Sequence, residues 1–223
     1  RSNARFAALQ HKEAPTERQP FYRMRVRLKR EIVTLGVPGL NPARNAGTYV
    51  KPEDWNALID DPDVVVVDTR NDYEVGIGTF ERAVNPHTKS FAEFPAWVAA
   101  QSQPGGVLAG KPRVAMFCTG GIRCEVISAM MKKRGFKEVY QIDGGIVKYG
   151  EKYGDDGLWE GALRVFDDRM TVEFSDHAAT IGECVHCGGK TSNFENCANM
   201  ACNELVLICE DCKNDPAKLF CGE

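Results

Sequence analysis

A short glycine loop between an apolar run and a helical pattern constrains this chain most. The run is Val114–Phe117, and residues 118–124, Cys-Thr-Gly-Gly-Ile-Arg-Cys, lead into a helical pattern that ends near Arg134. Strand, loop and helix in this order place the first free N–H groups of the helix around the residue that starts the loop. The positive helix end and the guanidinium of Arg123 both favour a thiolate there. We therefore predict Cys118 as the nucleophile and Arg123 as its catalytic partner, in an active-site loop completed by Thr119, Gly120, Gly121 and Ile122.

The spacing within this loop indicates sulfur chemistry. Cys118 and Arg123 are separated by four residues, one fewer than in the phosphate-holding loop of cysteine phosphatases. A tighter ring of N–H groups fits the single outer sulfur of a persulfide, Cys–S–S⁻, better than a tetrahedral oxyanion. A buried, inert cysteine at the end of a strand, followed by a turn that only joins two elements, explains the same residues.

Three further residues are candidates for accessory roles. Cys124 follows the loop arginine directly, where it either resolves a persulfide or sulfenic acid on Cys118 or packs the helix onto a sheet. Asp68 and Arg70 follow the β-branched run Val64–Val67, at the strand end where α/β sheets usually bind ligands. A local ion pair that fixes the loop is the simpler explanation of Asp68 and Arg70.

The alternation of strand-like runs with helical patterns predicts an α/β fold, with a parallel sheet and helices on both faces. We predict helices that begin at Pro52 and that span Phe91–Ala100, the second distorted by Pro95. A further short strand is predicted at Val139–Ile142. The reactive loop then lies where such folds usually bind ligands.

Composition divides the chain into five predicted segments. Residues 36–48 are rich in Gly and Pro and indicate a linker. The α/β pattern occupies residues 49–153, and a connector of residues 154–181 is expected to wrap around it. Residues 1–35 precede these segments as the remnant of another domain, and the cysteine-rich residues 182–223 follow them.

Residues 21–30 alternate strictly and predict a strand with one basic face. The basic side chains are Arg23, Arg25, Arg27 and Lys29. Residues 1–35 hold nine Lys or Arg against three acids, a balance of +6, so the rest of a chain of net charge −3 carries −9. Cations about 7 Å apart along a strand can follow a phosphate backbone. A charged strand edge that prevents aggregation explains the pattern without RNA.

Seven of the nine cysteines lie between residues 184 and 221, and two pairs have the spacing of zinc ligands. Each C-x2-C pair presents two thiolates from a tight turn to one tetrahedral ion. A segment with few large apolar side chains also needs a bound metal ion, or another cross-link, to stabilise its fold. We therefore predict one structural zinc ion, held by Cys184, Cys187, Cys209 and Cys212.

Other pairings of these cysteines remain open. His186 lies within the first pair, and the thiolates suffice without it. Disulfides formed on oxidation are one alternative. In another, Cys197 and Cys202 join Cys221 and a ligand beyond the end of the chain in a second metal site.

The sequence contains no apolar run near eighteen residues and no signal-peptide pattern. The clustered cysteines fit a reducing compartment, so we expect a cytoplasmic protein with no membrane partner. No organic cofactor is indicated, because no haem, flavin or iron-binding motif of two histidines and a carboxylate is found. The histidines, His11, His87, His177 and His186, are scattered. Nothing in the sequence indicates an oligomeric state.

Several motifs resemble those of rhodanese-type domains. They are residues 64–70 with Glu74 after them, residues 77–86, the Cys118 loop and residues 142–146. More narrowly, residues 47–52, 118–125, 144–149 and 165–169 resemble the rhodanese-related tRNA uridine hydroxylase family, from about Gln19 to the C-terminus. The resemblance implies a further N-terminal domain ahead of Pro20, most of which this chain lacks.

The resemblance implies oxygen-dependent hydroxylation of the wobble uridine of tRNA to 5-hydroxyuridine. Cys118 would carry the persulfide and Arg123 would hold the loop, with molecular oxygen as co-substrate and tRNA contacting the basic strand. Two alternatives remain. One is a rhodanese-type sulfurtransferase supplied by thiosulfate or by a sulfur-donor protein, which has no need of a basic strand; the other is a non-catalytic redox or zinc interaction module.

Overall fold

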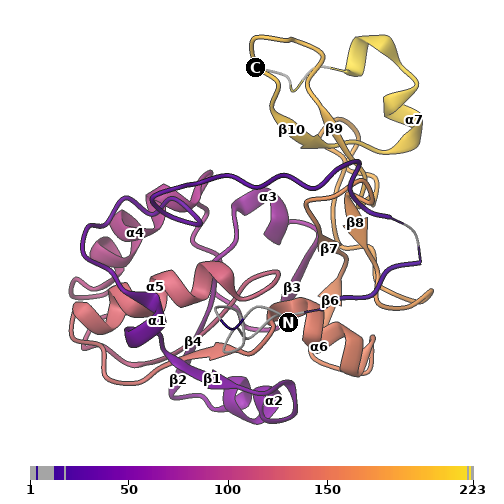
Figure 1. The fold of residues 1–223 in the computed structure, drawn as a ribbon. Coiled ribbons are helices and arrows are strands. Elements are labelled where there is room, and N and C mark those ends of the chain that lie inside the picture. The colour runs from indigo at the N-terminus through magenta and orange to yellow at the C-terminus, as the bar shows by residue number, and fades with distance from the viewer. Residues whose placement is uncertain (1–3, 5–12, 18, 220, 222–223) are drawn as a thin grey trace.

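The computed structural model describes residue 4 and residues 13–17, 19–219 and 221 (Figure 1). His11 and most of the first twelve residues of the predicted N-terminal segment lie outside this range. The central sheet has the order β1 (Thr48–Val50), β5 (Val139–Ile142), β4 (Arg113–Phe117) and β2 (Val64–Asp68), and every pair is parallel. Parallel neighbours need crossover connections, and the predicted parallel sheet is confirmed.

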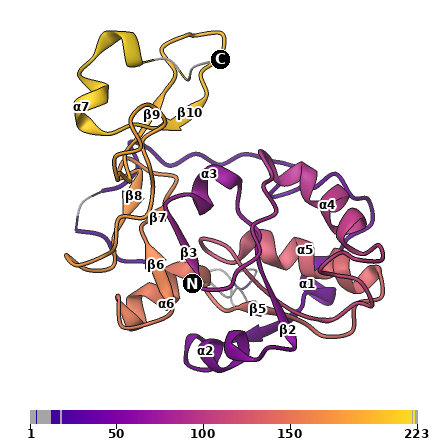
Figure 2. The same cartoon turned by 180° about the vertical axis from the view of Figure 1, so that it is seen from behind.

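Helices cover both faces of this sheet, as the two opposite views show (Figures 1 and 2). One face packs against α4 (Phe94–Gln101) and α5 (Ile122–Lys133), and the other against α2 (Pro52–Asp60) and α6 (Gly145–Tyr153). Successive residues of β4 alternate between these two cores, as side chains of a strand do. Val114 and Met116 join the first core, and Ala115 and Phe117 join the second.

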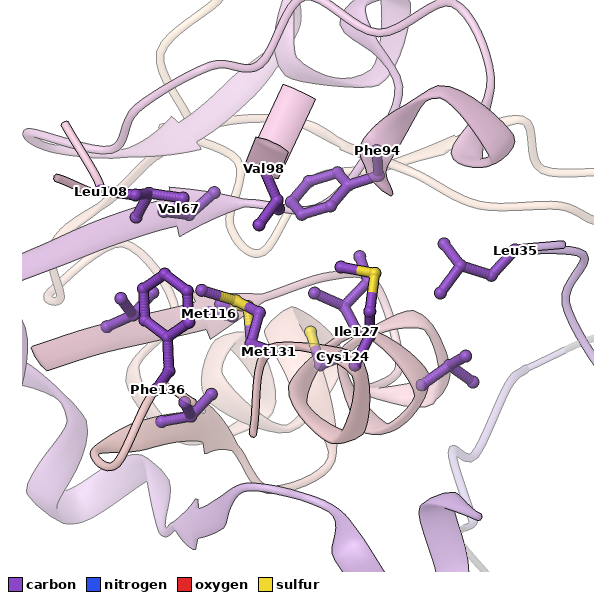
Figure 3. Packing of buried hydrophobic residues seen from close by; sticks show 14 of the residues in the cluster. Leu35, Val67, Phe94, Val98, Leu108, Met116, Cys124, Ile127, Met131 and Phe136 are labelled. Carbon is purple, nitrogen blue, oxygen red and sulfur yellow. The ribbon is translucent and has the colours of Figure 1, made fainter. Parts of the chain in front are cut away.

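The first core surrounds the helix that follows the glycine loop. Figure 3 shows Cys124 on α5 among the buried side chains that lie between this helix and α4. Helix α4 begins at Phe94, directly after a 3-10 turn at Phe91–Glu93, and Pro95 lies in its first turn. The predicted helix over Phe91–Ala100 is thus split just before Pro95, in keeping with the predicted distortion, because proline is tolerated in the first turn of an α-helix and not in its interior.

The predicted strand at residues 21–30 is not formed. These residues, which we call the basic arm, pair with no strand among the described residues. Both sets of alternating side chains are exposed, the apolar ones included. A strand needs a neighbour whose N–H and C=O groups complete the ladder, and alternation cannot supply one. The residues that flank the arm are held: the Asp168 N–H donates to the Pro20 carbonyl at 3.1 Å, and Val33 packs against the first core.

The segments predicted as linker and connector contain regular elements. Within the linker lies α1 (Pro42–Asn45), which packs against α5. Within the connector, β6 (Trp159–Gly161) pairs with β3 (Gly78–Phe80), and β7 (Leu163–Arg164) pairs with β8 (Thr171–Val172), both antiparallel. Both segments thus belong to the folded unit.

Residues 182–219 and 221 form what we call the cysteine-rich module, drawn in yellow and orange at one end of the molecule (Figure 1). It contains the hairpin of β9 (Phe194–Asn196) and β10 (Leu205–Leu207), followed by α7 (Glu210–Lys213) and a 3-10 turn at Pro216–Lys218. The module contacts the rest of the chain near α3 (Asp72–Val75), through a small apolar cluster around Ile77. Among the described helices, none combines the length and apolar character that crossing a membrane requires.

Candidate active site

The Cys118 loop joins β4 to α5 at the carboxyl edge of the sheet. Gly121 caps the helix with φ +89°, a left-handed conformation that suits glycine. Its N–H donates to Cys118 Sγ at 3.2 Å. The helix begins at Ile122, earlier than the sequence predicted, so that Arg123 lies in its first turn. The first free amides of α5 therefore surround the sulfur, as the spacing suggested.

A second helix start, that of α6, holds the same loop from behind. The N–H groups of Ile146 and Val147 donate to the carbonyls of Cys118 and Thr119 at 3.0 and 3.1 Å. Gly145, with φ +68°, allows this approach, because a Cβ there would lie 2.5 Å from the Thr119 oxygen and 2.6 Å from the Cys118 oxygen. The loop carbonyls are thus bonded to α6, and the loop N–H groups are left for the sulfur.

The environment of Cys118 favours its thiolate. Burial opposes ionisation, but a hydrogen bond from the Cys124 thiol, the charge of Arg123 and the backbone N–H groups of Cys124 and Arg123 lower the pKa of Cys118 to about 5. Burial and then the neighbouring Cys118 sulfur raise the pKa of Cys124 well above its ordinary value. These opposite shifts favour a thiolate on Cys118 beside a protonated Cys124.

Arg123 is fixed by a partner that the sequence analysis did not assign. Its Nη1 and Nη2 donate to the two carboxylate oxygens of Glu74 at 2.6 and 2.7 Å, and Nη2 also donates to Thr119 Oγ1 at 3.3 Å. Burial opposes the charge, but the Glu74 hydrogen bonds raise the pKa of Arg123 above its usual range. Glu74 forms a capping box with Asn71 at the start of α3, and this Asn-x-x-Glu pattern was the available sequence signal.

Asp68 and Arg70 form a buried ion pair at 2.5 Å, and both side chains are fully enclosed. The Arg70 guanidinium also donates to the carbonyls of Glu74 at 3.1 Å and Gly78 at 2.6 Å. The pair therefore links the end of β2 to α3 and β3, next to Glu74, which binds Arg123. This is the local ion pair that the sequence suggested, and it supports the site from behind.

A cavity of about 440 Å³ opens above the loop. Its floor is formed by Cys118, Thr119, Gly120, Ile122 and Arg123, and its walls by Ile32, Val33 and Phe166. Phe166 is 58% exposed, and its ring centroid lies 5.9 Å from the guanidinium carbon of Arg123 and 5.6 Å from that of Arg164. No role at the site was predicted for Phe166, because it belongs to the segment predicted to be a connector.

The basic arm leads to this cavity. Its last residues precede Ile32 and Val33, which line the wall above Cys118. All ten residues of the arm are exposed, including Arg23, Arg25, Arg27 and Lys29. The structure thus brings one end of the arm to the thiolate, whereas the cations themselves face solvent.

The four cysteines predicted as zinc ligands converge in the module. The sulfur atoms of Cys184, Cys187, Cys209 and Cys212 all lie within 4.8 Å of one another, and two of them, on Cys187 and Cys209, are 3.6 Å apart. Thiolates bound to zinc at about 2.3 Å are about 3.8 Å apart in a tetrahedron. This set can hold a metal ion, and His186 is outside it.

The parallel sheet and its thiolate loop define a protein of the rhodanese-like class. The family model "Rhodanese-like domain" matches residues 51–152, and "Rhodanase C-terminal" matches residues 160–223. A solved rhodanese-like domain from Anabaena sp. is similar over 51% of this chain and 78% of that chain, with 15% identity and a TM-score of 0.41.

Curated relatives give the narrower family. The tRNA uridine(34) hydroxylase of Corynebacterium urealyticum is 48% identical over 98% of this chain and 74% of that protein. The protein of the same name from Albidiferax ferrireducens is 59% identical over 77% of this chain and 54% of that protein. The chain belongs to this tRNA uridine(34) hydroxylase family. It spans about half the length of several of these relatives.

Proposed function

We propose that this chain is the rhodanese-like part of an enzyme that hydroxylates the wobble uridine of tRNA, at position 34, to 5-hydroxyuridine. The names of the relatives motivate the substrate. The observation that carries the proposal is that Cys118, in surroundings that favour its thiolate, lies on the floor of a largely apolar cavity with an exposed aromatic wall. A flat, uncharged nucleobase fits such a cavity.

The Phe166 ring supplies the surface on which the base stacks. Base–aromatic stacking contributes about 1–3 kcal/mol per base. The guanidinium groups of Arg123 and Arg164 lie over this ring, at 5.9 and 5.6 Å from its centroid, and the ring remains 58% exposed. A uracil stacked on Phe166 would lie in the cavity that Cys118 also lines.

The basic arm supplies the contact with the tRNA backbone. Residues 21–30 carry five cations and no acid. The flanking residues Pro20 and Val33 both contact the folded unit. Side chains that project from a segment held at both ends reach phosphates while the flipped base occupies the cavity. The arm thus orients the tRNA toward Cys118.

The overall reaction uses molecular oxygen and a thiol-class reductant. One oxygen atom replaces the hydrogen on C5 of uracil as a hydroxyl group, and two electrons and two protons from the reductant convert the other atom to water. The loop N–H groups and Arg123 stabilise Cys118 as a thiolate or persulfide. We place the enzyme in the cytoplasm, where tRNA and reducing conditions coexist. A structural zinc ion in the cluster of Cys184, Cys187, Cys209 and Cys212 would hold the module together.

Sulfur transfer is the second candidate, because the N–H groups around Cys118 also suit a persulfide intermediate. The thiolate would attack the outer sulfur of thiosulfate, form Cys–S–S⁻ and release sulfite. A thiol acceptor would then take the outer sulfur from Cys118. A sulfur-donor protein is the alternative to thiosulfate as the source. This chemistry uses the loop and leaves Phe166 and the basic arm without a role.

Cells that lack the gene, complemented with the full-length protein or its Cys118→Ser variant, test the main proposal. Mass spectrometry of tRNA nucleosides is expected to find 5-hydroxyuridine restored by the parent and absent with Cys118→Ser. Ser102→Ala, at a position in the loop that follows α4, is the control and should restore the nucleoside. If deletion leaves 5-hydroxyuridine unchanged while the parent protein forms sulfite from thiosulfate, sulfur transfer replaces the hydroxylase proposal.

A further inference from the structure

Three cysteines of the module lie outside the four-thiolate set, and they also converge. The sulfur atoms of Cys197, Cys202 and Cys221 lie within 4.8 Å of one another, and Cys202 and Cys221 are 3.6 Å apart. A disulfide would require about 2.05 Å, and all three are free thiols. The observed separation is close to the edge of about 3.8 Å expected between thiolates on one zinc ion.

These residues come from three places in the module. Cys197 directly follows β9, Cys202 lies in the turn of the hairpin, and Cys221 lies beyond the last 3-10 turn. The Ala198 N–H donates to the Leu219 carbonyl at 2.7 Å, which brings the end of the chain to the hairpin. The convergence therefore joins segments that sequence spacing alone does not bring together.

The turn that carries Cys202 has no apolar support. Residues 198–204 are all exposed, and Met200 among them is 91% exposed. Ordering such a stretch costs backbone entropy at every residue, and no buried side chain within the turn offsets that cost. A bound metal ion supplies the missing free energy in small modules of this kind.

We infer that Cys197, Cys202 and Cys221 hold a second zinc ion, in a site to which these three thiolates contribute and whose fourth position takes a further ligand. Cys197 is 4% exposed, whereas Cys202 is exposed, so the three-thiolate set lies at the surface of the module. Thiolate ligands select zinc over magnesium or calcium. Binding releases the thiol protons and leaves the zinc oxidation state unchanged. The inference does not depend on the proposed reaction.

Zinc content of the full-length protein, purified under reducing conditions, tests this site directly. Elemental analysis is expected to find about two zinc ions per chain in the parent and about one in a Cys197→Ser/Cys202→Ser variant. Cys124→Ser removes a buried thiol in the first core and should retain both ions. One zinc ion per chain in the parent, unchanged in the double variant, would overturn the inference.

Thiol labelling of the parent provides a readout that does not depend on a folded variant. Cys202 is exposed, so iodoacetamide would modify it rapidly if it had no ligand. We expect Cys202 and Cys221 to resist labelling until a chelator removes zinc, as peptide mass spectrometry would show. Rapid labelling of Cys202 in zinc-loaded protein, or a Cys202–Cys221 disulfide in protein kept reduced, would show that these cysteines hold no ion.

Discussion

Glu74 and Arg123 share two hydrogen bonds, of 2.6 and 2.7 Å, although they are 49 residues apart in the sequence. The bidentate contact fixes the plane of the guanidinium group. The Glu74 side chain is fully enclosed and that of Arg123 is 11% exposed, so solvent screens the pair weakly. Arg123 therefore acts on the Cys118 sulfur from a fixed position.

Glu74→Gln should destabilise the protein, because it leaves the buried Arg123 charge without its counter-ion. We expect the free energy of unfolding to fall by about 3 kcal/mol, near the lower end for broken buried pairs since glutamine keeps some hydrogen bonding. Urea unfolding measures the change. Glu160→Gln, at an exposed position, should change stability by less than about 0.5 kcal/mol. Equal changes in the free energy of unfolding for the two substitutions would show that the Glu74–Arg123 pair does not stabilise the fold.

The reactivity of Cys118 should follow a low pKa. Only the thiolate reacts with iodoacetamide, so the alkylation rate is expected to rise with pH through about 5 and then level off. Mass spectrometry of the Cys118 peptide gives this rate, and Cys118→Ser identifies the signal. Cys124→Ala removes a hydrogen-bond donor to the sulfur and should move the midpoint upward. A midpoint near the ordinary cysteine value of about 8.5 in the parent would refute the proposed thiolate.

Gly145→Ala should disturb the loop through its backbone. The new Cβ would lie 2.5 Å from the Thr119 oxygen, so α6 or the loop must move. Gly105→Ala is the matched control, because Gly105 also has a positive φ, +89°, but no heavy atom within 4 Å. Both variants carry the left-handed backbone cost of about 1–2 kcal/mol. In urea unfolding, only Gly145→Ala is expected to lower the free energy of unfolding by more than this backbone cost. It is also the only one of the two variants expected to slow alkylation of Cys118.

Phe166→Leu should weaken binding of the target base while preserving the apolar wall. Loss of stacking is worth about 1–3 kcal/mol, roughly a 5- to 150-fold rise in KM for tRNA. Phe166→Tyr retains the ring and should stay within about threefold of the parent, a difference of less than 1 kcal/mol. Steady-state assays of 5-hydroxyuridine formation by the full-length protein make the comparison. Equal KM values for both variants would exclude a stacking role for the ring.

Neutralising the basic arm should reduce the salt dependence of tRNA binding. In Arg25→Gln/Arg27→Gln, the slope of log K against log salt is expected to fall by about 0.7–0.9 for each phosphate that the arm no longer neutralises. Filter binding over a range of salt concentrations measures the slope. The control, Lys111→Gln/Lys137→Gln, removes equal charge at exposed positions that precede β4 and β5, at the opposite edge of the sheet. An unchanged slope in the arm variant would exclude phosphate binding there.

Local patterns in the sequence predicted the sheet and the nucleophile loop. The β-branched run before Asp68 and the strand, loop and helix around Cys118 are short-range signals, and both formed as expected. Residues 21–30 carry an equally regular pattern, but a strand also needs a partner, which periodicity does not encode. The alternation there therefore led to the wrong secondary structure.

Contacts between distant segments account for the parts of the site that were missed. Glu74 reaches Arg123 from another helix, and Phe166 approaches the cavity from beyond the α/β unit. Neither residue has a spacing relationship to Cys118 that sequence alone would reveal. By contrast, the spacing of Cys184, Cys187, Cys209 and Cys212 predicted their convergence, because each pair needs only a tight turn.

The two hydrogen bonds from the start of α6 also determine how readily the loop can change state. Flipping a peptide plane in the loop would break the bond from Ile146 or Val147 to a loop carbonyl and turn an acceptor toward the sulfur. The donors around Cys118 are therefore in position before the sulfur carries charge. Conversion between a thiolate and the proposed persulfide would then need little reorganisation energy, because the surrounding dipoles already have the orientation that both anions require.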